Sequence, residues 1–434
     1  MMNRKEYAQI DETLYIGRLS NGLSVFVSPK NGYHKCCAFF ATDYGSMDTR
    51  FKFSGNWIET PDGTAHFLEH KLFDMEDGNA ITLLSENGAS ANAFTSTDIT
   101  AYHFECIDKF QENLKMLLRF VSAPHFTPEG VEKERGIISQ EILMDKDDPD
   151  YCLYYGLMES LFSHSPLRVP ITGTVESIEE ITPETLYKCH NAFYVPSNMA
   201  LCVVGDVEPT EVFDIAESAL AAKMMELPER DYGLREPPRP AASRFSKDMD
   251  VSLPIFLAGC KTDPVPCGQE RLRLELVGAL TLDILAGHSS PLYFRLYKQG
   301  LVSSDFSASF DVSSGVAYTI FGGETREPER VFDEVNEEIA RLLKEGPDTE
   351  LLSRVKKALL GGFIRSLNSF DAICGNIVSS YFQRYDSFET PEILSSITGS
   401  DVAQFLQNSL ISDNMAISVI YPKSQQLKEE EETF

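Results

Sequence analysis

The chain has 434 residues, a length that favours two or three domains, each large enough to bury its own core. Its hydrophobic fraction of 43% and charged fraction of 24% are typical of a folded globular protein, and no apolar run is long enough to span a membrane. The formal net charge of -28 repels phosphate backbones and anionic headgroups, so nucleic acid and membranes are not expected as partners.

The first residues carry a positive pair, Arg4 and Lys5, with no apolar segment behind it. No secretory signal is therefore predicted, and a cytoplasmic location is expected. The 9 cysteines are odd in number and never spaced as Cys-x-x-Cys, which argues against a disulfide framework and against a cysteine-built zinc site. We expect most of them to be reduced thiols in the core.

Apolar periodicity in the first part of the chain predicts strands with helices between them. Strands are expected at 23–27, 36–40 and 89–104, a helix at 64–73, and the start of a second helix within 78–82. Asn31-Gly32, between the first two strands, predicts a hairpin turn.

Two later helices are predicted to begin with a threonine that is followed by proline and glutamate. These starts are Thr127-Pro128-Glu129 and Thr182-Pro183-Glu184, and both suit an N-cap followed by the first helical turn. The first of these helices is expected to end at Asp147-Asp148-Pro149.

A segment rich in proline and charge, 227–242, predicts a linker between an N-terminal domain, 1–226, and a C-terminal domain, 243–434. After the linker the pattern of strand and helix restarts. The predicted elements are strands at 255–258, 305–310 and 318–321 and a helix at 272–285. This restart indicates a duplicated α+β domain.

The first predicted helix contains His66-Phe67-Leu68-Glu69-His70. Residues four apart on a helix project from one face, so His66 and His70 can chelate one zinc ion. Glu69 can stand beside the open coordination position and take a proton from a water that zinc acidifies. The order His-x-x-Glu-His is the reverse of the commoner zincin motif and is called the inverzincin form. The alternative, surface histidines on an amphipathic helix, is disfavoured by the apolar neighbours.

A third protein ligand is required, and the helix that begins at Pro128 offers Glu132, Glu134 and Glu141. Glu134 and Glu141 are seven residues apart and so share a helical face. Spacing alone does not rank the three glutamates. The alternative for Glu134 and Glu141 is that both are solvated charges on the helix surface.

These motifs resemble those of the pitrilysin/insulinase family of metallopeptidases, and in particular the YmfH-like bacterial proteins. The resemblance rests on the stretch 64–73, on Asn92-Ala93-Phe94-Thr95, on the seven-residue relation of Glu134 and Glu141, and on Val204-Gly205-Asp206-Val207. It implies two homologous α+β domains, pitrilysin/insulinase-like or mitochondrial processing peptidase-like, that form half of a clam-shell.

The resemblance also implies the roles of the motif residues. His66, His70 and Glu141 would hold Zn2+, Glu69 would be the general base, and Glu134 would be a second catalytic carboxylate that supports the ligands. The implied activity is that of a zinc-dependent endopeptidase that hydrolyses peptides inside a chamber.

The segment around Asn92 and Ala93 resembles the edge strand on which the family binds a peptide substrate by β-augmentation. An ordinary strand with Asn92 in a turn is the alternative.

One departure from the family concerns the second domain, where active members carry an Arg and a Tyr that reach the substrate. In the matching stretch Tyr297 stands at the Arg position and Ser303 at the Tyr position, while Arg295 lies two positions off register. The chain therefore resembles one member of a heterodimer whose metal-less partner carries the Arg/Tyr pair. A non-catalytic scaffold subunit of the same fold and a self-sufficient homodimeric peptidase are the alternatives, and the intact metal motif argues against the scaffold.

Overall fold

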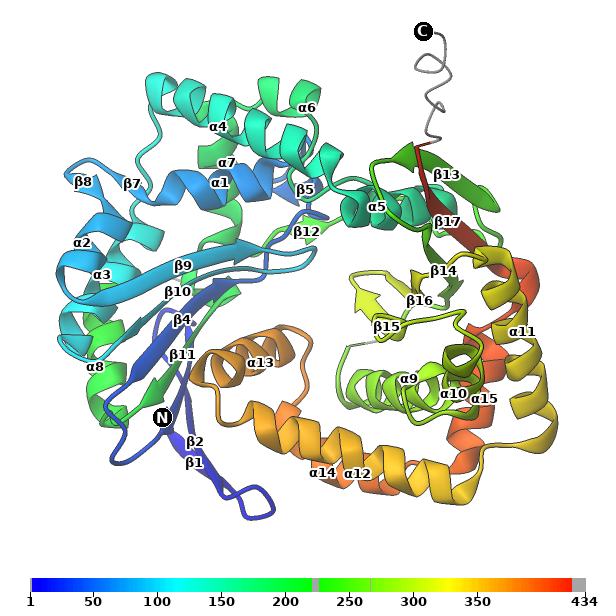
Figure 1. Ribbon diagram of the computed structural model, residues 1–434. Coiled ribbons are helices and arrows are strands. Elements are labelled where there is room, and N and C mark those ends of the chain that lie inside the picture. The colour runs from blue at the N-terminus through cyan, green and yellow to red at the C-terminus, as the bar shows by residue number, and fades with distance from the viewer. Residues whose placement is uncertain (1, 221–225, 266, 424–434) are drawn as a thin grey trace, which may run out of the picture.

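A computed structural model describes residues 2–220, 226–265 and 267–423. The last part of the predicted C-terminal domain, 424–434, lies outside these residues. Figure 1 shows two α+β halves, with the sheet of the first half on the left and the sheet of the second half on the right. No helix in the described ranges is long and apolar enough to cross a membrane.

The first half is built on a seven-stranded sheet in the order β1-β2-β3-β11-β4-β10-β9. Its strands are β1 (Asn3–Tyr7), β2 (Glu12–Arg18), β3 (Ser24–Pro29), β4 (Cys36–Thr42), β9 (Ala89–Thr95), β10 (Thr100–Cys106) and β11 (Met199–Gly205). The predicted strand at 89–104 is thus a hairpin of β9 and β10. Two small sheets accompany it, made of β5 (Arg50–Phe53), β6 (Asn56–Glu59) and β12 (Glu229–Arg230), and of β7 (Asp74–Met75) and β8 (Gly78–Asn79).

The predicted hairpin between β3 and β4 is wrong, because β11 lies between the two strands. β11 pairs parallel to β3 and antiparallel to β4. The connection 30–35 crosses two strand spacings, about 10 Å, which six extended residues span easily. The Lys30 N–H donates to the Gly205 carbonyl of β11, 2.7 Å away, so the chain turns past β11 rather than back onto β3.

Helices cover one face of this sheet and form the larger core. The helices of the first half are α1 (Thr64–Leu72), α2 (Ala80–Glu86), α3 (Phe110–Ser122), α4 (Pro128–Asp147), α5 (Pro149–Leu161), α6 (Val175–Glu179), α7 (Pro183–Phe193) and α8 (Pro209–Ala219). The predicted N-caps are confirmed: Thr127 Oγ1 accepts from Gly130 N at 3.0 Å, and Thr182 Oγ1 accepts from Thr185 N at 3.2 Å.

The second half repeats the topology of the first. Its five-stranded sheet has the order β13-β17-β14-β16-β15, which matches β3-β11-β4-β10-β9 in both neighbours and strand directions. Its strands are β13 (Arg244–Met249), β14 (Ile255–Thr262), β15 (Ser307–Ser313), β16 (Val316–Glu324) and β17 (Met415–Pro422). Its helices are α9 (Gln269–Ala286), α10 (Pro291–Lys298), α11 (Pro328–Glu345), α12 (Thr349–Ser366), α13 (Phe370–Phe382), α14 (Thr390–Ser396) and α15 (Gly399–Ser409). The predicted fold of two homologous α+β domains is confirmed.

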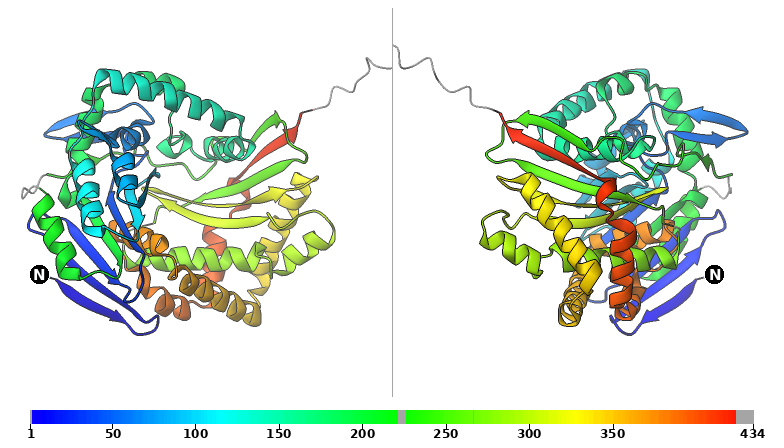
Figure 2. Two further views of the ribbon diagram at one scale, coloured as in Figure 1. Left: turned by 60° about the vertical axis from the view of Figure 1, so that its left-hand side comes forward. Right: turned by 90° about the vertical axis from the view of Figure 1, so that its right-hand side faces the viewer.

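The two halves exchange one helix each. Helix α5 of the first half packs on β13, β14 and β17 of the second sheet, and α13 of the second half packs on β4 and β11 of the first sheet (Figure 1). The two helices hold equivalent places in the repeated element order. The opposite face of the second sheet is covered by α11 and α15, which lie in front of it in the right-hand view of Figure 2. The halves are therefore interlocked by packing.

Candidate metal centre

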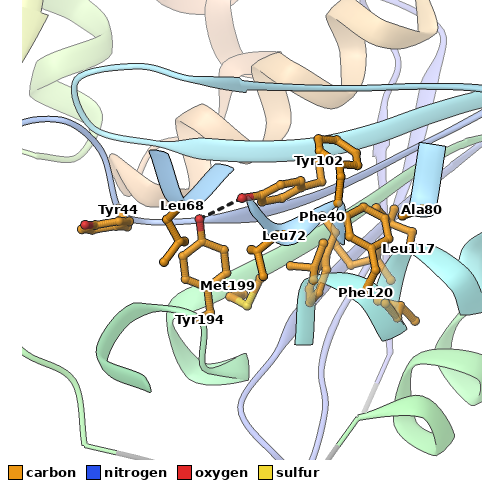
Figure 3. Packing of buried hydrophobic residues seen from close by; sticks show 14 of the residues in the cluster. Phe40, Tyr44, Leu68, Leu72, Ala80, Tyr102, Leu117, Phe120, Tyr194 and Met199 are labelled. Atoms are coloured by element: carbon orange, nitrogen blue, oxygen red, sulfur yellow. Dashed lines mark hydrogen bonds between the residues drawn. The ribbon is translucent and has the colours of Figure 1, made fainter. Parts of the chain in front are cut away.

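Helix α1 is anchored on one side by apolar residues, which aims its polar residues at a common site. Leu68 and Leu72 are fully buried and pack in the core beside Tyr102 (Figure 3). Gly63, directly before the helix, has φ 85°, and a Cβ there would lie 2.5 Å from the Thr172 carbonyl oxygen. The start of α1 is thus held close to Thr172, in the segment that follows α5. Helix α1 also packs against α4.

The three predicted ligands, His66, His70 and Glu141, converge between α1 and α4. His66 Nε2 lies 3.5 Å from Glu141 Oε1, and His70 Nε2 lies 3.8 Å from Glu141 Oε2. One ligand atom from each residue lies within 4.8 Å of the other two. Zinc bonds of about 2.0–2.2 Å in a tetrahedral arrangement separate ligand atoms by roughly 3.3–3.5 Å. The two distances to Glu141 are close to this spacing, and the 4.8 Å limit is wider, so a bound zinc ion would draw the two imidazole nitrogens and the carboxylate slightly together.

The environment of His66 favours the neutral imidazole, which is the form that binds metal. Burial, together with the charge of nearby His70, lowers the pKa of His66 to about 3. Its Nδ1 atom is buried without a hydrogen-bond partner among the described residues. The ring is therefore held by packing.

Glu134 binds the second histidine from the side away from Glu141. His70 Nδ1 lies 3.0 Å from Glu134 Oε1, which leaves Nε2 directed at Glu141. Burial lowers the pKa of His70, but the hydrogen bond to Glu134 and the charges of Glu69 and Glu141 outweigh it, so the net pKa is raised. A carboxylate in this place orients the ring of a ligating histidine.

The structure separates the three glutamates that spacing could not rank. Glu141 meets both histidines, and Glu134 meets the far nitrogen of one of them. Glu132 pairs instead with Arg135, and its side chain is 74% exposed.

Glu69 lies beside the ligands without joining them. Only 8% of it is exposed, and Thr95 Oγ1 of β9 donates a hydrogen bond of 2.7 Å to its Oε2. Burial raises the pKa of Glu69, while the bond from Thr95 and the charge of His70 oppose the rise. A buried carboxylate with a raised pKa is suited to accept a proton and pass it on.

Asn92 and Ala93 lie in β9, which is the last strand of its sheet. They pair with His103 and Tyr102 of β10, and no other described strand pairs with β9. The Ala93 N–H donates to Asn92 Oδ1 at 2.9 Å. The strand contacts α1, and its Thr95 reaches Glu69, so β9 lies beside the metal centre.

In the second half, Tyr297 occupies the position at which an arginine was expected from the family resemblance, and Arg295 is engaged elsewhere. Tyr297 is 56% exposed on α10, and its ring stacks on Tyr293 at 5.7 Å. Arg295 points instead to α11, where it forms ion pairs with Glu334 at 3.2 Å and Glu338 at 3.7 Å. Ser303 is exposed after α10, where its hydroxyl donates a hydrogen bond to its neighbour Asp305.

Two residues of the centre were not singled out from the sequence. Thr95 was part of a motif but had no role, and its hydroxyl reaches Glu69. Lys71, next to His70, has a fully buried side chain that contacts Glu134 and Asp74. Lys71 was part of the stretch 64–73 but, like Thr95, had no role assigned to it.

Comparisons with known proteins find relatives that are named as zinc proteases. A model of the insulinase family (peptidase family M16) matches residues 54–175, and a model of the peptidase M16 inactive domain matches residues 180–359. The chain is 38% identical over 434 residues to a protein of Bacillus subtilis named uncharacterized zinc protease YmfH, with 98% of this chain and 100% of that protein covered.

Solved structures show the same fold. The crystal structure of an M16-like peptidase from Alicyclobacillus acidocaldarius superposes with a TM-score of 0.91 at 35% identity and covers 95% of this chain and 99% of its own. Pitrilysin superposes with a TM-score of 0.78 at 17% identity and covers 97% of this chain, which spans 46% of the pitrilysin chain.

Proposed function

Because the chain belongs to the insulinase (M16) family of peptidases, we propose that it is the zinc-bearing subunit of a zinc-dependent endopeptidase. The observation that carries this proposal is the convergence of His66, His70 and Glu141 on one point, with Glu69 buried beside them. The alternative of surface histidines does not account for two imidazoles and two carboxylates gathered in a largely buried place.

In the proposed reaction, the residues of the chain divide the work. A zinc ion held by His66, His70 and Glu141 would acidify a water molecule and polarise the scissile carbonyl. Glu69 accepts the proton of the attacking water and returns it to the amine nitrogen that leaves. Glu134 supports the site through His70, whose ring it holds by the bond to Nδ1.

The substrate is proposed to be a peptide that adds to the free edge of β9. Main-chain groups along that edge have no strand partner among the described residues, which suits β-augmentation. The bond from Ala93 N–H to the Asn92 side chain is one that a substrate carbonyl could replace. Around it, the carboxylates of the centre and the net charge of -28 favour neutral or basic peptides.

The peptidase is proposed to be complete only with a second, metal-less family member that supplies the Arg/Tyr pair. Arg295 is tied to Glu334 and Glu338, and Tyr297 and Ser303 stand where the family motif has the pair. The chain also spans only about half of pitrilysin. We further propose a zinc-binding domain at 1–226, a linker at 227–242 and an inactive homologous domain at 243–434, in a cytoplasmic protein.

The proposal is tested by measuring zinc content and the hydrolysis of quenched peptides by the purified chain, alone and mixed with a metal-less relative. We expect stoichiometric zinc in the wild-type chain and its loss in His66→Ala and Glu141→Ala. We also expect activity that appears on mixing and vanishes in Glu69→Gln. Bound zinc without hydrolysis in any mixture would instead support a scaffold subunit. An active homodimer of the chain alone would contradict the proposed need for a metal-less partner.

A further inference from the structure

We propose that Lys71 is a positioning residue of the metal centre, which acts by holding the Glu134 carboxylate against His70. The inference rests on the proposed zinc site and extends it to a lysine that makes no contact with the ligand atoms themselves. This role would explain why α1 carries a charged side chain that is buried.

The burial of Lys71 is the first observation. Its side chain is 1% exposed, and its apolar neighbours Leu68 and Leu72 in α1 are buried as well. An ammonium group out of water is costly unless it is paired. The Lys71 Nζ forms an ion pair with Asp74 and lies 3.9 Å from Glu134 Oε2.

The place of the ammonium group is unusual. It lies against the first turn of α4, where a Cβ added to Gly130 would be 3.1 Å from Nζ and 3.1 Å from the capping Thr127 Oγ1. The N-terminal end of a helix repels a cation through its dipole. The two carboxylates therefore provide the attraction that keeps Lys71 there, and the missing side chain of Gly130 provides the space.

Glu134 is consequently held at both of its oxygens. Oε1 meets His70 Nδ1 at 3.0 Å, and Oε2 faces Lys71. Asp74 is fixed in turn by Asn79 Nδ2 at 3.3 Å, and Asn79 caps α2. A chain of polar contacts thus runs from the start of α2 to the ring of a proposed ligand. Partners of this kind set the orientation of a ligating histidine and commonly change metal affinity.

The test uses Lys71→Met, which keeps the length of the side chain and removes its charge, in the full chain. The affinity of the metal-free protein for zinc is measured by chelator competition, and the ligand geometry is followed in the absorption spectrum of bound Co2+. A loss of about tenfold in zinc affinity is expected. The matched control is Lys115→Met, which removes the same charge from an exposed position of α3 and should leave the affinity unchanged.

A double-mutant cycle separates positioning from a general structural effect. If Lys71 acts through Glu134, Lys71→Met will not weaken zinc binding further in the Glu134→Gln background. Should Lys71→Met not fold, Gly130→Ala provides a second variant, because its Cβ would lie 3.1 Å from Nζ and would crowd the ammonium group while the charge stays. It should weaken zinc binding and alter the Co2+ spectrum in the same direction.

The inference would be overturned if Lys71→Met bound zinc as tightly as the wild-type chain. It would also be overturned if Lys71→Met weakened zinc binding as much in the Glu134→Gln background as in the wild-type chain. Either result would leave the zinc site in place. If the unmodified chain binds no zinc, or binds it equally well without His66 and His70, the proposed function itself fails, and this inference fails with it.

Discussion

At the level of single residues, the hydroxyl of Thr95 connects the edge strand to the proposed general base. Its 2.7 Å hydrogen bond is donated to Glu69 Oε2, and Thr95 itself lies two residues beyond Ala93 in β9. A substrate bound along β9 would therefore lie next to the residue that holds Glu69. Hydrogen bonds to a charged group are stronger than those between neutral groups.

Replacing Thr95 with valine should slow peptide hydrolysis without removing zinc. A hydrogen bond to a charged group contributes about 1.5–3 kcal/mol, so kcat/KM should fall about tenfold to a hundredfold. Thr97→Val is the control, because the Thr97 hydroxyl bonds to Ser313 and not to Glu69. Unchanged kcat/KM in Thr95→Val, or loss of zinc from it, would contradict the role given to Thr95.

Removal of the metal should also be visible in stability. If zinc binds the folded chain and not the unfolded one, a free concentration of 100 times Kd stabilises the fold by about 2.7 kcal/mol. A strong chelator should therefore lower the thermal midpoint of the wild-type chain and of His34→Ala, whose histidine is exposed and remote in the sequence. His66→Ala should already melt at the lower midpoint and should not respond to the chelator. A chelator response in His66→Ala would place the stabilising metal elsewhere.

At the level of elements, the contact of α5 with the second sheet is close enough to be tested by one added methyl group. A Cβ on Gly156 would lie 2.3 Å from the ring of Phe245 in β13. Overpacking of this kind costs about 1–3 kcal/mol. The preference of alanine for helices recovers only about 0.5–1 kcal/mol.

Gly156→Ala should therefore lower the urea midpoint of unfolding. The matched control is Gly136→Ala in α4, where nothing lies within 4 Å of the added Cβ. It should raise the stability by up to about 1 kcal/mol through helix propensity alone. Equal shifts in the two variants would mean that α5 does not pack on β13 as tightly as the structure indicates.

At the level of the whole molecule, the exchange of α5 and α13 makes each half depend on the other. The buried faces of these helices and of the sheets beneath them are apolar, as with Leu153 and Leu157 on α5 and with Ile373 and Ile377 on α13. A half that is separated from its partner would expose the apolar face of one helix and the apolar face of one sheet. Large exposed apolar patches lead to association.

Fragments 1–242 and 243–434 should accordingly fail to fold alone and should recover zinc binding when they are coexpressed. Circular dichroism during thermal unfolding and the zinc content of the purified complex would measure both effects. A cooperative unfolding transition in either fragment by itself would show that the exchanged helices are dispensable for its stability.

The sequence by itself determined the local features of this protein. The spacing of His66 and His70 on one helical face, the caps at Thr127 and Thr182, and the repetition of strand and helix all arise from contacts within a few residues, which periodicity and cap chemistry report directly. The family resemblance of the same motifs indicated the fold and the zinc chemistry.

Only the tertiary structure decided what depends on residues far apart in the chain. The choice between Glu132, Glu134 and Glu141 required the packing of α4 against α1, because all three share one helix. The insertion of β11 between β3 and β4, against the local turn signal, depends on a strand more than 150 residues later in the chain. The burial of Lys71 and the exchange of α5 and α13 likewise follow from which surfaces meet, and spacing along a single chain does not encode which surfaces meet.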